Sequence, residues 1–165
     1  MGLWNNFKLK NDSNKTNIGI SLFFEKDIEK DLRKEYINFV KWLRINYIFP
    51  VHLNVYILNC EKVKVLDGSL AYGSFRYFNK RNPRIKIPSL INYDSYEDCT
   101  KDEIYDSVLS SLVHEITHYY QWIEKLEQSA YNSERQADYY RFKILDRYYK
   151  DAKKNRENKA NIKIF

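Results

Sequence analysis

The sequence predicts an α+β domain in which a small, mostly antiparallel sheet packs on helices. Three observations lead to this fold class. Residues 51–57 alternate apolar and polar side chains, which is the two-residue period of a half-buried strand. Residues 27–46 and 100–128 instead repeat apolar side chains every three to four residues, the period of a buried helix face. Short strand-like segments lie between these two helical segments, and this grouping is typical of the α+β class.

The first half of the chain shows distinct local patterns. Residues 1–16 are polar and rich in Asn and Lys, so we expect them to be loose or peripheral. A short apolar strand is predicted over residues 18–24, before the helix at 27–46 and the strand at 51–57. His52 lies on the opposite side of that strand from the apolar residues, which indicates a surface histidine rather than a metal ligand.

Further strands are expected between the two helical segments. Apolar and aromatic residues favour strands over 62–66, 70–78 and 84–87. Asp67-Gly68 is a dipeptide typical of turns, and a second turn is expected around residues 79–83. These short strands and turns make up the predicted sheet.

The segment that begins at residue 100 carries the clearest helix signals. The tetrapeptide 100–103 matches a capping box, with Thr100 as the N-cap. Apolar residues then recur at helical spacing, and no Gly or Pro interrupts the segment. Residues 128–133 indicate a turn, with Asn132 or Ser133 as the N-cap of a second helix.

Length, composition and cysteine count indicate the class of protein. A chain of 165 residues with 44% hydrophobic and 16% aromatic residues suits one globular domain, which we expect to span 1–165 with residues 151–165 loose or peripheral. No apolar run approaches the roughly 20 residues of a membrane span, and the N-terminus lacks the apolar core of a secretory signal. Cys60 and Cys99 are too few for a disulfide framework, so we expect a cytoplasmic protein.

The formal net charge of +6 raises the possibility of a nucleic-acid partner. Much of the excess positive charge, however, lies in the segment from Lys150 to Lys163. The simpler interpretation of that segment is a solvated tail or helix end. We therefore expect a protein or peptide partner before a nucleic acid.

An H-E-x-x-H motif, His114-Glu115-Ile116-Thr117-His118, lies within the second predicted helix. Residues four apart lie one above the other on a helix, so His114 and His118 can point two imidazole nitrogens at one zinc ion. Glu115 then lies beside the open coordination position, where it can take a proton from a water molecule. The chain has only three histidines, which makes a chance match rare. The plain alternative is two helix-surface histidines beside an ordinary glutamate.

A catalytic zinc site needs a third protein ligand, which can be His, Asp or Glu. No histidine follows His118, so a carboxylate must serve, and Glu124 and Glu127 are expected to continue the first helix away from the metal. Glu134 opens the second helix, with Asp138 one turn later, and an antiparallel return would bring both onto the histidines. Glu134 is therefore the expected third ligand, and Asp138 is placed to accept the N–H of a ligating histidine. Alternatively, both are acids that favour a helix N-terminus.

The order of these residues resembles a known family. His114-Glu115-x-x-His118 followed by Glu134-x-x-x-Asp138 resembles the gluzincin zinc metallopeptidases. The heptapeptide that begins at Glu134 is similar to the glutamate helix of small intracellular gluzincin-like proteins. These include the mini-gluzincins and the repressor-cleaving peptidases of phages and mobile elements. The resemblance implies a zincin-like fold, one zinc ion per chain on His114, His118 and Glu134, Glu115 as the general base, and Asp138 as the support of a histidine.

Two further properties follow from this resemblance. In the family, an edge strand near the active helix binds an extended peptide by strand addition, and Gly73–Phe78 is the best candidate for that strand. The plain alternative is a structural strand with aromatic core residues. Larger gluzincins stabilise the oxyanion with a histidine or tyrosine from a second lobe. This chain has no spare histidine, and Tyr131, Tyr139 and Tyr140 are the nearby tyrosines that could substitute.

We therefore expect a small zinc metallopeptidase in which Glu115 takes a proton from a zinc-activated water that attacks a peptide carbonyl. Two alternatives stay open. A non-catalytic zinc-binding or partner-binding module would need no general base, so the presence of Glu115 argues against it. A DNA-associated protease similar to the SprT-like family usually completes its zinc site with a third histidine, which is missing after His118.

Overall fold

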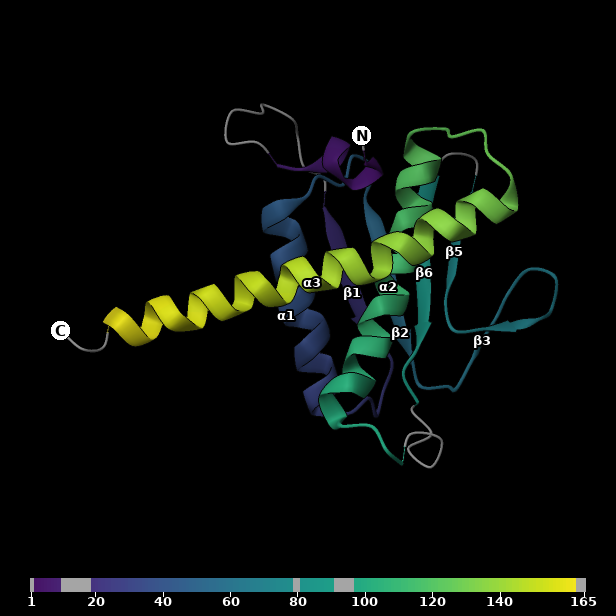
Figure 1. The fold of residues 1–165 in the computed structure, drawn as a ribbon. Helices are drawn as coiled ribbons and strands as arrows, with labels where there is room; N and C mark the ends of the chain where they lie inside the picture. The colour runs from purple at the N-terminus through teal and green to yellow at the C-terminus, as the bar shows by residue number, and fades with distance from the viewer. Residues whose placement is uncertain (1, 10–18, 79–80, 91–96, 163–165) are drawn as a thin grey trace.

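The computed structural model describes residues 2–9, 19–78, 81–90 and 97–162, which form an α+β fold (Figure 1). In chain order the elements are η1 (Leu3–Phe7), β1 (Ile20–Phe24), α1 (Lys30–Asn46), β2 (Leu53–Leu58), β3 (Val63–Lys64), β4 (Leu70–Ala71), β5 (Ser74–Phe78), β6 (Arg81–Pro88), α2 (Lys101–Ile123) and α3 (Ala130–Ile162). A four-stranded sheet forms one layer, α1 and α2 pack on one of its faces, and α3 crosses both helices on the side away from the sheet. The predicted α+β class is confirmed.

The direction of the strands differs from the prediction. The order in the sheet is β1-β2-β6-β5, with β1 parallel to β2, β2 parallel to β6, and only β5 antiparallel to β6. The expectation of a mostly antiparallel sheet is therefore wrong. The reason is that α1 carries the chain from the end of β1 back to its start before β2 begins, and such a crossover joins parallel strands. The mixed sheet leaves β5 at an edge, where the segment 73–78 was expected.

The apolar side of the sheet forms the core with the helices. Leu53, Val55 and Ile57 alternate along β2 and are fully buried, whereas the residues between them are only partly buried.

The predicted strand over 70–78 is divided into two strands, β4 and β5. β4 pairs with β3 in a separate hairpin, which contains the expected Asp67-Gly68 turn. β6 begins at Arg81, so it overlaps the turn expected around 79–83, of which residues 79 and 80 lie outside the described part of the chain.

α2 begins as predicted and ends earlier than predicted. The Thr100 hydroxyl accepts a hydrogen bond from the Glu103 N–H, and the Glu103 carboxylate accepts one from the Thr100 N–H, which confirms the capping box. The helix ends at Ile123, so Glu124 and Glu127 do not continue it. Lys125 has a φ of 52° and its N–H donates to the Trp122 carbonyl. This left-handed C-terminal turn usually carries Gly, and for that reason the sequence did not reveal it.

α3 begins four residues before Glu134. The Ser129 hydroxyl accepts a hydrogen bond from the Asn132 N–H, 3.2 Å away, and caps the helix. The expected caps, Asn132 and Ser133, therefore lie inside the helix. Glu134 is consequently in the second turn of α3, where it faces α2.

The N-terminal segment differs from the expectation of a loose or peripheral chain. Leu3, Trp4 and Phe7 of η1 are buried, and the Trp4 indole N–H donates to Thr117 Oγ1 over 2.9 Å. Residues 10–16 lie outside the described part of the chain. At the other end, α3 continues through residues 151–162, and the Trp42 indole N–H donates to Asp151 over 2.9 Å.

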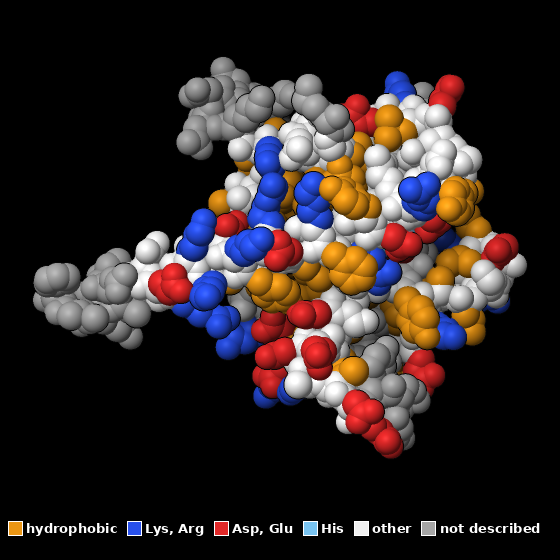
Figure 2. All heavy atoms as spheres, viewed as in Figure 1, with side chains coloured by type: hydrophobic (Ala, Val, Ile, Leu, Met, Phe, Trp, Pro, Cys, Tyr) orange, Lys and Arg blue, Asp and Glu red, His pale blue; other side chains and the backbone are white. Residues whose placement is uncertain are grey.

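Charged side chains are unevenly distributed over the surface. Figure 2 shows Lys and Arg gathered over the middle of α3, and Asp and Glu gathered near the N-terminal end of α2. Burial and then the charges of Arg147 and Lys143 lower the pKa of Lys8 in the basic region. These three basic residues do not line the cleft described below. Among the described residues, no helix combines the length and the apolar character that a membrane span requires.

Candidate metal centre

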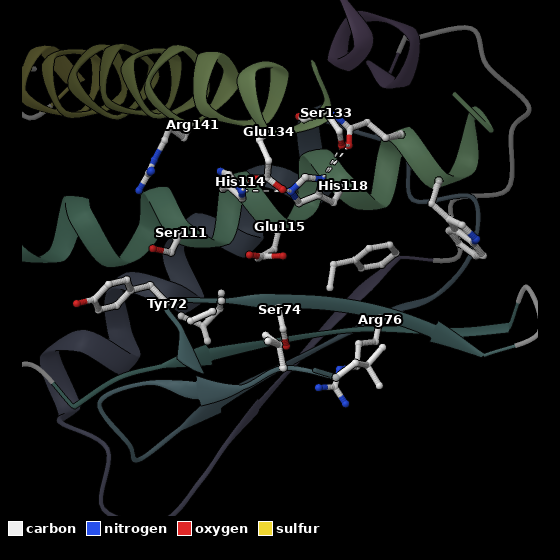
Figure 3. A pocket seen from close by; sticks show the side chains of 18 of the residues that line it. Tyr72, Ser74, Arg76, Ser111, His114, Glu115, His118, Ser133, Glu134 and Arg141 are labelled. Atoms are coloured by element: carbon white, nitrogen blue, oxygen red, sulfur yellow. Dashed lines mark hydrogen bonds and ion pairs between the residues drawn. The ribbon is translucent and has the colours of Figure 1, made fainter. Parts of the chain in front are cut away.

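The middle of α2 and the first turns of α3 line a cleft whose opposite side is β5 (Figure 3). The cleft has a volume of about 1710 Å³. α2 contributes His114, Glu115 and His118, and α3 contributes Glu134. The two helices run antiparallel at this point, which brings Glu134 back onto the histidines although 16 residues separate it from His118.

Three ligand atoms converge between the two helices. Nε2 of His114 and Nε2 of His118 lie 3.1 Å apart. The Glu134 carboxylate places one oxygen 3.1 Å from Nε2 of His114 and the other 3.3 Å from Nε2 of His118. A tetrahedral zinc ion with bonds of about 2.0–2.2 Å separates its ligand atoms by roughly 3.3–3.6 Å. With one ligand atom from each residue, the three atoms lie within 4.8 Å of one another, which is close enough for them to converge on one such ion.

The hydrogen bonds on the far side of each imidazole indicate which nitrogen carries a proton. Nδ1 of His114 lies 3.1 Å from Asp138 Oδ1, and Nδ1 of His118 lies 2.8 Å from Gln121 Oε1. Both partners accept hydrogen bonds, so each Nδ1 carries the proton and each Nε2 presents a lone pair. Burial and then His118 lower the pKa of His114, which favours the neutral ring. Two lone pairs and the Glu134 carboxylate repel one another unless a cation lies among them.

Gln121 was not identified from the sequence. Its orientation is fixed because its Nε2 donates to the Ser133 carbonyl over 3.0 Å and to Gln136 Oε1 over 2.9 Å. The Ser133 hydroxyl donates to Gln121 Oε1 over 2.7 Å. The acceptor atom of Gln121 therefore faces His118. The sequence feature that could have identified Gln121 is its spacing, since it follows His118 by three residues and shares its side of the helix.

Glu115 lies between the metal site and β5. Its carboxylate accepts a hydrogen bond from the Phe75 N–H and packs on the backbone of Gly73. A Cβ atom at Gly73 would lie only 2.6 Å from Glu115 Oε1. Burial first and Glu134 second raise the pKa of Glu115 to about 8 in the absence of an ion. A nearby cation would favour its ionised form.

Other predicted candidates do not join this cluster. Among the described residues, the only group of His, Cys, Asp or Glu side chains close enough to hold a metal ion is that of His114, His118 and Glu134. His52 Nε2 lies 3.0 Å from Ser21 Oγ, away from the cluster. The three tyrosines considered for oxyanion stabilisation do not line the cleft; these are Tyr131, Tyr139 and Tyr140.

Comparison of the chain with protein-family models, with curated proteins and with solved structures finds no match. The assignment of the site therefore depends on its own geometry and chemistry.

Proposed function

We propose that this chain is a zinc-dependent metallopeptidase with a zincin-like arrangement of helices and sheet. The observation that supports it best is the placement of Glu115 beside the convergent His114, His118 and Glu134 atoms, on the side that faces an open cleft. A purely structural zinc site is closed by four protein ligands and needs no adjacent base. Here the described residues supply three ligand atoms and one buried carboxylate next to them.

The proposed mechanism assigns a separate task to each residue. His114, His118 and Glu134 would hold one zinc ion, which lowers the pKa of water and polarises a carbonyl group. Glu115 accepts the proton of the attacking water and transfers it to the leaving amine. The Phe75 N–H holds the Glu115 carboxylate in place for both transfers. Asp138 and Gln121 keep the two imidazole rings in the tautomer that leaves Nε2 free.

The edge strand offers a binding surface for the substrate. Among the described strands β5 pairs only with β6, so its other side can add an extended peptide through main-chain hydrogen bonds. Phe75 and Tyr77 both contact the ring of Trp122 on α2, with the Tyr77 and Trp122 ring centres 5.2 Å apart. This aromatic group lines the cleft and favours contact with apolar side chains of a peptide.

The test is a comparison of metal content and cleavage in four variants. The parent and Glu115→Gln should each carry close to one zinc ion per chain, whereas His118→Ala and Glu134→Ala should lose it. With casein as the probe, Glu115→Gln should lower the rate of cleavage by about 10²-fold or more, because the isosteric amide cannot accept the proton. Glu124→Gln, an exposed substitution at the end of α2, is the matched control and should cleave like the parent.

Three results would overturn this proposal. Full zinc content in both His118→Ala and Glu134→Ala would show that the metal, if any, binds elsewhere. Equal cleavage by the parent and Glu115→Gln would show that Glu115 is not the general base. Absence of cleavage by the zinc-loaded parent would favour a non-catalytic zinc module.

A further inference from the structure

Arg141 lines the cleft next to the metal centre and has no part in the mechanism above. It lies on α3 one turn after Asp138, at the same end of the cleft as Ser111 and Tyr72 (Figure 3). Its side chain is 28% exposed, so it is accessible from the cleft. Nη1 donates to Asp138 Oδ1 over 3.4 Å, and Nη2 donates to Ser110 Oγ over 2.9 Å. These contacts anchor the guanidinium between α2 and α3.

The anchored guanidinium retains donors for a ligand. An arginine has five N–H groups, and each of the two terminal nitrogens carries two of them. The contacts with Asp138 and Ser110 use one N–H of each terminal nitrogen. Nε is buried without a partner, so it is out of reach of a substrate. One N–H on each of Nη1 and Nη2 remains, and such a pair suits bidentate binding of a carboxylate.

The position of Arg141 along the cleft determines which part of a peptide it meets. β5 runs from Ser74 to Phe78, and the end of the cleft with Arg141 lies beyond the start of that strand (Figure 3). A peptide that pairs antiparallel with β5, as β6 does, runs in the opposite direction. Its reacting carbonyl would lie over Glu115, near Gly73 and Phe75. The residues after the scissile bond would then lie at the end of the cleft with Arg141.

We propose that Arg141 determines substrate specificity by binding a carboxylate on the C-terminal side of the scissile bond. That carboxylate belongs either to an Asp or Glu side chain or to the C-terminus of the peptide. The inference rests on the proposed peptidase function. Glu115, Glu134 and Asp138 place three carboxylates near the reacting bond, so a substrate carboxylate needs a cation there to offset their repulsion.

The test uses two pools of synthetic decapeptides with randomised sequences, one with free C-termini and one amidated. Cleavage sites are mapped by mass spectrometry. In the amidated pool, we expect the parent to cleave before Asp or Glu about tenfold or more in preference to Asn or Gln, if side chains supply the carboxylate. If the C-terminus of the peptide supplies the carboxylate instead, cleavage should occur only in the pool with free C-termini, at the last bonds of each peptide. Arg141→Gln should abolish the preference, and Arg135→Gln, which removes a charge from the exposed side of α3, should keep it.

A binding measurement gives a readout without turnover. Zinc-loaded Glu115→Gln is titrated with a fluorescent peptide from the preferred set and with its counterpart in which an amide replaces the carboxylate. The carboxylate should bind about tenfold or more tightly, and the double variant Glu115→Gln, Arg141→Gln should bind both equally. If Arg141 only positions Asp138, its substitution lowers affinity for both peptides and leaves their ratio unchanged, which overturns the inference.

The outcomes separate this inference from the function it depends on. Cleavage that requires Glu115 but shows no preference for carboxylates after the scissile bond overturns the role of Arg141 alone. Preference for a carboxylate before the scissile bond has the same effect, because it places the substrate in the opposite direction. Absence of cleavage by the zinc-loaded parent overturns both proposals.

Discussion

Asp138 Oδ1 lies 3.1 Å from Nδ1 of His114, on the side of the ring opposite the Nε2 atom that faces Glu134. Asp138 and Glu134 are four residues apart on α3, so one helical turn carries both a proposed ligand and the group that orients a second ligand. A carboxylate in this position fixes the tautomer of the imidazole and increases its basicity toward a metal.

Replacing Asp138 with Ala should weaken zinc binding without abolishing it. Partners of this kind contribute about 10–100-fold in metal affinity, because the freed ring can rotate and protonate on the wrong nitrogen. Competition with a chromophoric chelator would measure the change. Asp146→Ala is the matched control, since Asp146 lies two turns further along α3 and pairs with Lys150. Equal zinc affinity in Asp138→Ala and the parent would contradict the role.

Substitution of Gln121 should weaken zinc binding to a comparable extent, through the second histidine, His118. Gln121→Ala removes the acceptor for Nδ1 of His118 and should lower zinc affinity by about tenfold or more in the same competition assay. Gln121→Glu keeps an acceptor at that position and should retain more affinity than Gln121→Ala. Gln128→Ala is the control, because Gln128 is exposed and donates only to Gln136 among its described contacts. If the Ala and Glu variants bind zinc equally, Gln121 does not orient His118.

The cluster of ligand atoms was accessible from the sequence because it depends on helix geometry. Spacing of four residues places His114 and His118 on one side of α2 whatever surrounds the helix. Glu134 and Asp138 required one further assumption, an antiparallel return of α3, which the structure contains. Gln121 was missed because an amide is not part of a metal motif, and its role appears only when Ser133 and Gln136 fix its orientation.

The errors in the fold come from long-range pairing. The alternation in β2 predicts a half-buried strand and is the same whether its neighbours are parallel or antiparallel. At the N-terminus, polar composition led to the wrong expectation of a loose or peripheral segment. Three of its residues enter the core: Leu3, Trp4 and Phe7. The early end of α2 depends on Lys125 in a left-handed conformation, which no local signal favours.

Trp4 should contribute strongly to stability and anchor η1 on α2. Its ring is 1% exposed and packs edge-on against Tyr47 and Tyr120, and its N–H donates to Thr117 of α2. Trp4→Ala should lower the free energy of unfolding by about 3–5 kcal/mol, measured by urea denaturation. Tyr131→Ala, at an exposed position of α3, is the control and should change it by less than about 0.5 kcal/mol. A loss below 1 kcal/mol in Trp4→Ala would show that η1 is not part of the core.

Gly73 is required by the position of Glu115 rather than by its own backbone. Among the described glycines, Gly19 and Gly68 have positive φ angles and Gly73 does not, so alanine is compatible with its conformation. The added Cβ would, however, lie 2.6 Å from Oε1 and 2.9 Å from Cγ of Glu115. This close contact can be relieved only if the Glu115 carboxylate moves, because its flexible side chain shifts more easily than the backbone of β5.

Gly73→Ala should therefore fold and bind zinc like the parent while peptide cleavage falls. A displacement of about 1 Å at a catalytic group can lower the rate by roughly 10²-fold, so we expect a decrease of about 10–100-fold in kcat/KM. Ser74→Ala is the matched control on the next residue of β5. The Ser74 hydroxyl is buried without a partner and faces away from Glu115, so its removal should leave cleavage within about twofold of the parent. Undiminished cleavage in Gly73→Ala would mean that Glu115 can act from a different position, and it would remove β5 from the catalytic arrangement.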